Sequence, residues 1–349
     1  MITKRNRYAF ILGCERSGST WLSNICDSHP ATEFFMEPFA DYANIFPGFP
    51  HRNLYVSGES KALTELIREG YVSLIKLKYP FLHTRDGPRI WKTVDTLLVS
   101  AVSKITVSKL FRPSTKLEQY HLLHLNQAAD RRHLERGKNE DIDIFITKEL
   151  RLNFKLKLIN EAFPGAKYIV ITRNPRAQLS SILNLFEKGN LGELQRSLIS
   201  FKEYVILTSR FARYHHVLRH LQESDLIEML VLWWIINYET VIQDCKDLNT
   251  EYLIVEHEKL SQSPINVVAD ILKLFDLDMP RNVKDYIAIS TTHSRVIMSA
   301  VDTVRDSQSY YKNAIQNARE EVIDRIQKTA MKIEIIPEIG HYFADFDSS

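Results

Sequence analysis

Short apolar segments alternate with amphipathic ones along this chain. The apolar segments are rich in β-branched and aromatic residues, which is typical of strands buried on both faces; they cover residues 8–12, 32–36, 142–147, 168–172 and 252–255. The amphipathic segments have helical spacing and cover residues 20–28, 152–163, 175–188, 226–244 and 265–275. This alternation predicts an α/β fold, in which about five parallel strands form a sheet flanked by helices and joined by right-handed crossovers.

The second and third predicted strands are about a hundred residues apart, far more than one crossover requires. We therefore predict a large helical insertion at residues 41–140, with helices near 59–78 and 116–136. The insertion is the expected place for a lid or for acceptor recognition. A C-terminal helical region is expected at 276–349, and the whole chain, 1–349, is expected to form a single domain.

Composition and net charge exclude several classes of protein. The chain has 349 residues, of which 44% are hydrophobic and 25% charged, as in ordinary globular proteins rather than disordered ones. Its 45 Lys and Arg against 43 Asp and Glu give a net charge of +2, so no overall charge favours nucleic acid as a partner. Residues 76–116 are an exception, with nine cations and two acids. They form either a solvated basic surface or a field that attracts an anionic acceptor or the nucleotide.

The three cysteines, Cys14, Cys26 and Cys245, are far apart and include no CxxC pair. This argues against a disulfide framework and against a structural zinc site, and it favours a reducing compartment. The first apolar segment is too short for a signal-peptide core, and no run of about 20 apolar residues occurs. We expect a cytoplasmic protein without a membrane span and without a metal.

The first apolar segment leads into a turn with the chemistry of a phosphate-binding loop. In residues 10–22, FILGCERSGSTWL, glycines allow the backbone to approach an anion, and the following helix directs its N-terminal dipole at it. The spacing from Gly13 to Gly18 is that of a Walker A loop, but Ser19 stands at the position of its lysine. That lysine acts on the β- and γ-phosphates in kinases and NTP hydrolases, so its absence disfavours an ATP-dependent kinase. The cation of this loop comes earlier, at Arg16.

A second polar cluster follows the fourth predicted strand in residues 167–181, KYIVITRNPRAQLSS. Arg173 comes directly after the strand, and Ser181 lies two turns into the next helix. Ligands of open α/β sheets bind beyond the carboxyl ends of the strands, which places Arg173 on the same edge as Arg16. Two cationic groups at one edge predict a ligand with two separated anionic groups.

Five segments together resemble the sulfotransferases that use 3'-phosphoadenosine 5'-phosphosulfate (PAPS), closest to the carbohydrate and tyrosylprotein branch: GCERSGSTWL, HPATEFFMEPF, FITKEL, FPGAKYIVITRNPRAQLSS and YLIVEHEKLSQSP. The resemblance covers residues of about 8–40 and 142–275. It implies a P-loop-like sheet, PAPS as donor, the bisphosphate PAP as product, and no metal. It also implies that Arg173 and Ser181 hold the 3'-phosphate and that the first loop holds the 5'-phosphosulfate, through Arg16, Ser17, Gly18, Ser19, Thr20 and Trp21.

The resemblance further implies three catalytic residues: Glu37, Lys148 and Arg16. An acceptor hydroxyl needs a base when it attacks sulfur, and a partly buried glutamate with a raised pKa, such as Glu37, suits that task. Lys148 would neutralise the charge that develops on the leaving group. Glu37 could instead cap a turn or form an ion pair, and Lys148 could be part of a structural ion pair.

These patterns predict transfer of a sulfuryl group by in-line displacement to a hydroxyl of an organic acceptor, a carbohydrate or other small molecule. The alternatives are a catalytically silent nucleotide-binding module of the same fold, or a P-loop kinase. Glu37 and Lys148 argue against the silent module, since binding alone requires neither. Where relatives have a tyrosine, this chain has His257, which is expected to be a packed or capping residue. Trp233 and Trp234 are expected in the core. The acceptor's identity and a homo-oligomeric state stay open.

Overall fold

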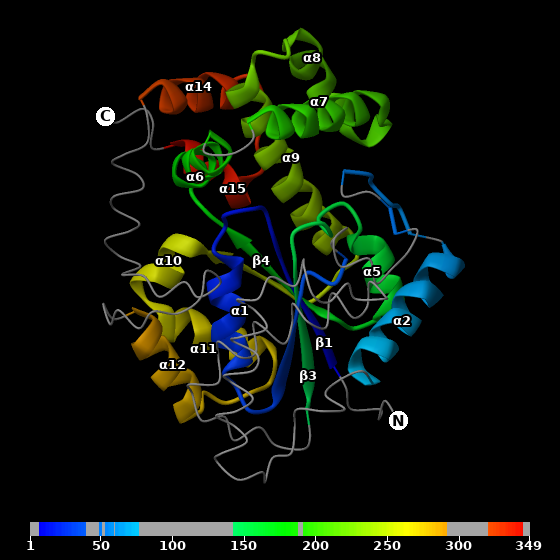
Figure 1. Ribbon diagram of the computed structural model, residues 1–349, viewed down its shortest axis with the longest axis vertical. Helices are drawn as coiled ribbons and strands as arrows, with labels where there is room; N and C mark the ends of the chain where they lie inside the picture. Colours follow the sequence, from blue (N-terminus) through cyan, green and yellow to red (C-terminus); the bar gives the residue numbers. More distant parts are fainter. Residues whose placement is uncertain are drawn as a thin grey trace, which may run out of the picture.

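The structure is a computed structural model, and it describes residues 7–39, 49–50, 53–58, 60–76, 142–187, 191–291 and 320–344. Within these ranges, five strands form one sheet in which every neighbouring pair is parallel, in the order β2-β3-β1-β4-β5. The strands are β1 (Arg7–Gly13), β2 (Thr32–Met36), β3 (Ile144–Glu149), β4 (Lys167–Thr172) and β5 (Tyr252–Glu256). The predicted α/β class is confirmed (Figure 1).

Strand β1 lies at the centre of the sheet, where Ile11 pairs with Lys148 of β3 and with Ile169 of β4. A strand in this position is covered by helices on both faces, which explains its uninterrupted apolar sequence. Strand β3 begins at Ile144 and extends to Glu149, so Lys148 belongs to the strand rather than following it. The carboxyl ends of β1, β3 and β4 therefore lie side by side at one edge.

The helices are α1 (Ser19–Asp27), α2 (Lys61–Lys76), α5 (Leu156–Ala162), α6 (Pro175–Glu187), α7 (Leu191–Leu207), α8 (Ala212–His220), α9 (Leu226–Asp247), α10 (His257–Gln262), α11 (Pro264–Leu274), α12 (Arg281–Thr291), α14 (Glu320–Ala330) and α15 (Pro337–Ala344), with a 3₁₀ turn, η1, at Ser209–Phe211. The five predicted helices are present; four of them lie between strands, and α11 follows β5. Helix α5 begins four residues later than expected, because residues 152–155 form a turn closed by the Lys155 N–H on the Leu152 carbonyl.

Two hydrophobic cores cover the two faces of the sheet, because successive strand residues face opposite sides. Ile11 belongs to the core formed with α1, α10, α11 and α12, whereas Leu12 belongs to the larger core, which includes residues of α2, α5 and α9. Figure 1 shows these two groups of helices on opposite sides of the strands, with α6, α7, α8, α14 and α15 above their carboxyl ends. Trp233 and Trp234 are buried in the larger core, as expected.

Among the described helices, only α9 is long and apolar enough to cross a membrane. Of its most apolar window, 78% is buried inside the protein. The helix packs between α7 and the sheet, as a core helix does.

Much of the predicted insertion lies outside the described residues, including the helix expected at 116–136 and the basic side chains of 76–116. Helix α2 (Lys61–Lys76) confirms the first helix expected in the insertion. In the C-terminal region, the helices among the described residues after 276 are α12, α14 and α15.

Candidate active site

The loop between β1 and α1 adopts a backbone suited to binding an anion. Arg16 and Gly18 have positive φ angles of 66° and 91°, and the Ser17 N–H donates to the Cys14 carbonyl at 3.2 Å. Gly18 is the N-cap of α1 and supplies no side chain to cap it. An uncapped helix N-terminus combines free N–H donors with the positive end of the helix dipole, so it can bind a phosphate or sulfate group.

Side chains from four other elements fix the backbone of this loop. Three of its carbonyl groups accept hydrogen bonds and one N–H group donates one, which leaves the loop little freedom. The contacts are Asn153 Nδ2 to the Gly13 carbonyl (3.1 Å), the Cys14 N–H to Tyr238 Oη (3.4 Å), Gln178 Nε2 to the Glu15 carbonyl (2.7 Å) and Arg173 Nη1 to the Arg16 carbonyl (2.8 Å). The loop is thus held in shape before any ligand binds.

His257, at the start of α10, packs directly against Gly18. A Cβ atom added to Gly18 would lie 2.1 Å from His257 Cδ2. Burial, reinforced by the nearby Arg173 guanidinium, lowers the pKa of His257 to about 3. The expected packed role of His257 is confirmed, and its imidazole is neutral at physiological pH.

The second cluster meets the first loop at the end of β4. Arg173 is buried there, and its neighbour Asn174 caps α6 by accepting the Arg176 N–H at 2.9 Å. Arg16 Nε donates to Ser181 Oγ on α6 at 3.0 Å. Arg16, Arg173 and Ser181 thus lie together, so the Arg16 side chain joins the two regions that the sequence treats as separate.

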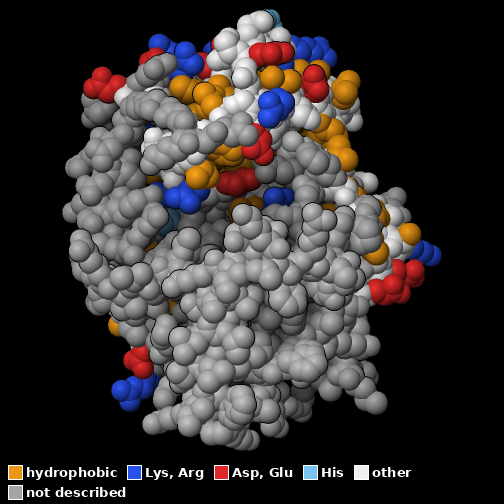
Figure 2. Space-filling view, in the orientation of Figure 1, with side chains coloured by type: hydrophobic (Ala, Val, Ile, Leu, Met, Phe, Trp, Pro, Cys, Tyr) orange, Lys and Arg blue, Asp and Glu red, His pale blue; other side chains and the backbone are white. Residues whose placement is uncertain are grey.

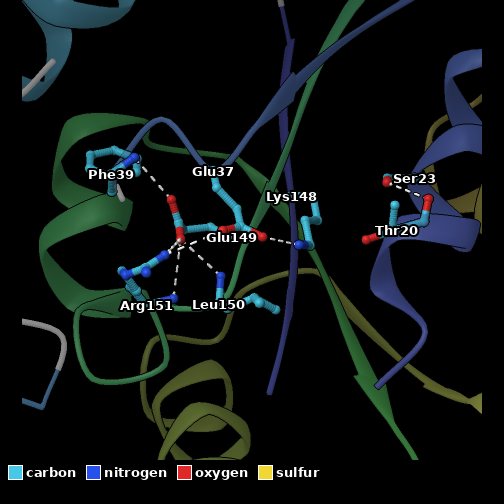
Figure 3. Close-up of polar contacts among 8 residues, drawn as sticks. All are labelled: Thr20, Ser23, Glu37, Phe39, Lys148, Glu149, Leu150 and Arg151. Carbon is cyan, nitrogen blue, oxygen red and sulfur yellow. Dashed lines mark hydrogen bonds and ion pairs between the residues drawn. The ribbon is translucent and has the colours of Figure 1, made fainter. Parts of the chain in front are cut away.

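The remaining predicted loop residues lie at the start of α1. Ser17 is fully buried, and its Oγ has no hydrogen-bond partner among the described residues. Ser19 is also buried, and Thr20 lies on the side of α1 that faces Lys148 (Figure 3). Trp21 Nε1 donates to Ser290 Oγ of α12 at 3.1 Å, and its indole lies edge-on to the His257 ring.

Glu37 and Lys148 are in direct contact (Figure 3). Lys148 Nζ pairs with Glu37 Oε1, and Arg151 Nη1 lies 3.3 Å from Glu37 Oε2. Glu37 is 7% exposed and Lys148 2% exposed, so the pair is shielded from water. The ion pair weighed as an alternative is therefore present. The Glu37 carboxylate thus lies between two cationic side chains.

Glu149 and Arg151 were not singled out from the sequence, although both belong to this cluster. Glu149 is fully buried; its Oε2 accepts the Phe39 N–H at 2.9 Å, and its Oε1 accepts the Leu150 N–H at 2.9 Å and the Arg151 N–H at 3.3 Å. Burial and the neighbouring Glu37 raise the pKa of Glu149 to about 7. The sequence did carry one signal for this cluster, since a lysine and a glutamate end an apolar strand. Buried charges are almost always paired, so these two residues predict charged partners nearby.

Helix α15 closes the edge of the sheet behind Arg173. Tyr342 Oη lies 2.9 Å from Thr172 Oγ1 at the end of β4, and it donates to Glu258 Oε2 at 3.3 Å. Glu258 Oε1 in turn accepts the Asn174 N–H at 3.0 Å. Burial raises the pKa of Glu258. The C-terminal region thus supports the strand end that carries Arg173.

Figure 2 shows basic and acidic side chains together in a recess in the middle of its face, below α7 and α8. The carboxyl ends of the strands point toward this level in Figure 1. In the ranges that the structure describes, no group of three or more His, Cys, Asp or Glu residues could hold a metal ion. All three cysteines, Cys14, Cys26 and Cys245, are free and buried.

A sequence profile of the sulfotransferase family matches residues 9–281, from β1 to the start of α12. The match covers well over half of the chain, and the chain belongs to this family. The protein is therefore a sulfotransferase, an enzyme that transfers a sulfuryl group to an acceptor. None of the curated proteins compared with the chain matches it.

Several solved structures of sulfotransferases are similar to this chain at low sequence identity. The sulfotransferase domain from the curacin biosynthetic pathway is 12% identical with a TM-score of 0.43, over 99% of this chain and 98% of that one. STF9 from Mycobacterium avium is 13% identical with a TM-score of 0.41, over 99% and 78%. Mouse SULT7A1, solved with PAP, is 9% identical with a TM-score of 0.41, over 97% and 89%. The family assignment rests on the sequence profile.

Proposed function

We propose that the protein transfers the sulfuryl group of PAPS to a hydroxyl of an organic acceptor. The observation that carries this proposal is the meeting of Arg16, Arg173 and Ser181 beside the uncapped start of α1. Two arginines, a hydroxyl and a helix N-terminus at one edge suit a donor that carries a 3'-phosphate and a 5'-phosphosulfate. An ordinary nucleotide lacks the first of these groups.

The orphaned Ser17 hydroxyl supports this assignment of the loop. A buried hydroxyl without a hydrogen-bond partner costs stability, and a phosphate or sulfate oxygen would satisfy it. In this proposal, the loop from Arg16 to Thr20 binds the 5'-phosphosulfate, and Arg173 with Ser181 binds the 3'-phosphate. The neutral His257 fills space against Gly18 and adds no charge.

The Glu37–Lys148 pair supplies the proposed chemistry. The acceptor oxygen forms a bond to sulfur while the bond from sulfur to the bridging phosphate oxygen breaks. The hydroxyl proton passes to the Glu37 carboxylate, and the electron pair of the broken bond stays on the leaving phosphate of PAP. Lys148, paired with Glu37 in the present structure, neutralises the charge on that phosphate.

For the acceptor, we propose a carbohydrate or another small molecule with a hydroxyl group. An anionic acceptor remains our prediction from the basic residues 76–116, most of which lie outside the described residues. Transfer of labelled sulfate from PAPS into an extract of the source cells, followed by identification of the product, would reveal the acceptor.

Replacing Arg173 with alanine tests the donor site. We expect Arg173→Ala to weaken PAP binding by about 1.5–3 kcal/mol, the contribution of a hydrogen bond to a charged group. Affinity for adenosine 5'-phosphosulfate, which lacks the 3'-phosphate, should fall less, only by the part that comes from the lost Arg173 hydrogen bond to the Arg16 carbonyl of the loop. Isothermal titration calorimetry with both ligands measures the difference, and Arg176→Ala on the next turn serves as the matched control. Equal losses for both ligands would show that Arg173 is structural.

A further inference from the structure

We propose that Glu149 is a positioning residue for sulfuryl transfer. Through the Phe39 N–H group and the Arg151 side chain, it holds the turn after β2 so that the Glu37 carboxylate lies against Lys148 (Figure 3). This inference rests on the proposed function, in which Glu37 accepts the proton of the acceptor.

The turn after β2 needs support from outside its own sequence. Glu37 has a φ of 47°, a left-handed conformation that costs a residue with a side chain about 1–2 kcal/mol. Two backbone N–H groups of the turn are held by β3. The Glu37 N–H donates to the Lys148 carbonyl at 2.8 Å, and the Phe39 N–H donates to Glu149 Oε2 at 2.9 Å. Glu149 therefore holds the turn at one of these two N–H groups.

Glu149 also orients the cation that contacts the other oxygen of Glu37. Arg151 Nη1 lies 3.9 Å from Glu149 Oε1 and 3.3 Å from Glu37 Oε2, so one guanidinium bridges both carboxylates. The backbone N–H of Arg151 donates to the same Oε1 atom of Glu149. The Glu37 carboxylate thus contacts Lys148 on one side and Arg151 on the other, and Glu149 sets the position of Arg151.

Stability alone does not account for a carboxylate at this position. Glu149 is fully buried and lies near a second carboxylate, and both features disfavour its charged form. Buried ion pairs often add little net stability compared with apolar residues of similar volume. The contacts of Glu149 converge instead on the Glu37 turn, where a misplacement of about 1 Å can lower the rate of a reaction by about 10²-fold.

A double-mutant cycle tests this inference. The cycle compares wild type with Glu149→Gln, Glu37→Gln and the double variant. The measured quantities are kcat, acceptor KM and affinity for PAP, and the acceptor is the one identified by the labelled-sulfate experiment. We expect Glu149→Gln to lower kcat roughly 10- to 100-fold, because one oxygen of the carboxylate becomes an N–H donor that faces other N–H donors. PAP affinity should stay within about twofold. In the Glu37→Gln background, Glu149→Gln should lower kcat less than about threefold, because the base it positions is gone.

Glu239→Gln is the matched control. Glu239 is a buried carboxylate that accepts the Ile336 N–H at 2.9 Å and pairs with Arg213, so it shares the chemistry of Glu149 but lies on α9, among contacts to the C-terminal region. Burial raises its pKa as well. Glu239→Gln should change unfolding free energy without changing kcat.

The outcomes separate this inference from the proposed function. Full activity of Glu37→Gln would remove the base and overturn the proposed function. If Glu37→Gln loses activity, two results would overturn the positioning role alone. One is an unchanged kcat in Glu149→Gln, and the other is a double variant in which kcat falls by the product of the two single losses. If Glu149→Gln does not fold, Arg151→Gln takes its place in the same cycle, with the same expected coupling to Glu37.

Discussion

At the scale of single residues, Gly18 shows how closely the loop is packed. Its φ of 91° suits glycine, and a Cβ atom would overlap the His257 ring. Gly18→Ala should therefore lower the unfolding free energy by about 1–3 kcal/mol from backbone strain, with a further loss from the overlap. Denaturant unfolding measures the total, and calorimetry should show weaker PAP binding.

Gly165 provides the control for this substitution. Its φ of 80° is also positive, but nothing lies within 4 Å of an added Cβ atom. Gly165→Ala should show the cost of strain alone, so the difference between the two variants isolates the overlap with His257. In the double variant Gly18→Ala/His257→Ala, the overlap is gone, so the unfolding free energy should regain only the part lost to that overlap. Equal losses in Gly18→Ala and Gly165→Ala would mean that His257 moves aside freely.

The residues of the candidate site were predictable to different degrees. Arg173 directly follows an apolar strand and Arg16 lies in the loop after another, so the sequence alone placed both at one edge of the sheet, whereas Lys148 was identified through the family resemblance. Glu149 and Arg151 were missed because their function depends on contacts with the Glu37 turn, 110 to 114 residues away along the chain. Sequence spacing carries no record of such a pairing. The direct contact of Arg16 with Ser181 was missed for the same reason.

At the scale of elements, α6 and α9 together hold the loop. Gln178 of α6 is fully buried, donates to the Glu15 carbonyl and accepts the Trp234 Nε1–H of α9 at 2.9 Å. Gln178→Met keeps the side-chain length but removes the hydrogen bonds to the Glu15 carbonyl, Trp234 and Tyr238, which should cost about 2–5 kcal/mol of unfolding free energy. The loop should also become less ordered, so PAP affinity should fall. Chemical denaturation and calorimetry measure the two effects.

Gln195→Met is the matched control for Gln178→Met. Gln195 of α7 also donates to a backbone carbonyl, that of Glu223 at 3.1 Å, but at the surface and away from the loop. Its replacement should change stability by less than about 0.5 kcal/mol and leave PAP affinity unaltered. A loss of PAP affinity in both variants would show that Gln178 acts on general stability rather than on the loop.

Helices and strands were predictable where their hydrophobic pattern was strong. All five strands and the five predicted helices followed from the sequence, with shifts of a few residues at their ends. Helix α5 was expected to begin at residue 152, but residues 152–155 turn instead, and this turn presents Asn153 to the Gly13 carbonyl. Helices α7 and α8 were not predicted, because they extend a connection that a simple strand–helix alternation does not require.

At the scale of the whole molecule, stability should depend on pH through Glu149. Its folded-state pKa of about 7 lies above the ordinary value of 4.5, so the folded protein binds more protons than the unfolded chain between these values. Stability from this group is present below pH 4.5 and is lost as pH rises to 7. The charged and titratable groups around it are Glu37, Lys148, Arg151 and Tyr71 of α2.

Glu149→Gln should remove this pH dependence. The unfolding free energy of the variant, relative to wild type, should therefore rise between pH 4.5 and 7, as measured by urea denaturation at several pH values. A constant difference between Glu149→Gln and wild type across this range would show that the carboxyl titrates alike in the folded and unfolded states.

The contact between Tyr342 and Thr172 has a consequence for the order in which the protein forms during synthesis. The two residues are 170 positions apart. A ribosome that adds roughly 5–20 residues per second needs about 10–35 s to make the chain between them. All five strands are complete before α15 has been translated, yet the end of β4 still lacks its hydroxyl partner. The sheet can therefore form before the support behind Arg173, which becomes available only late in translation.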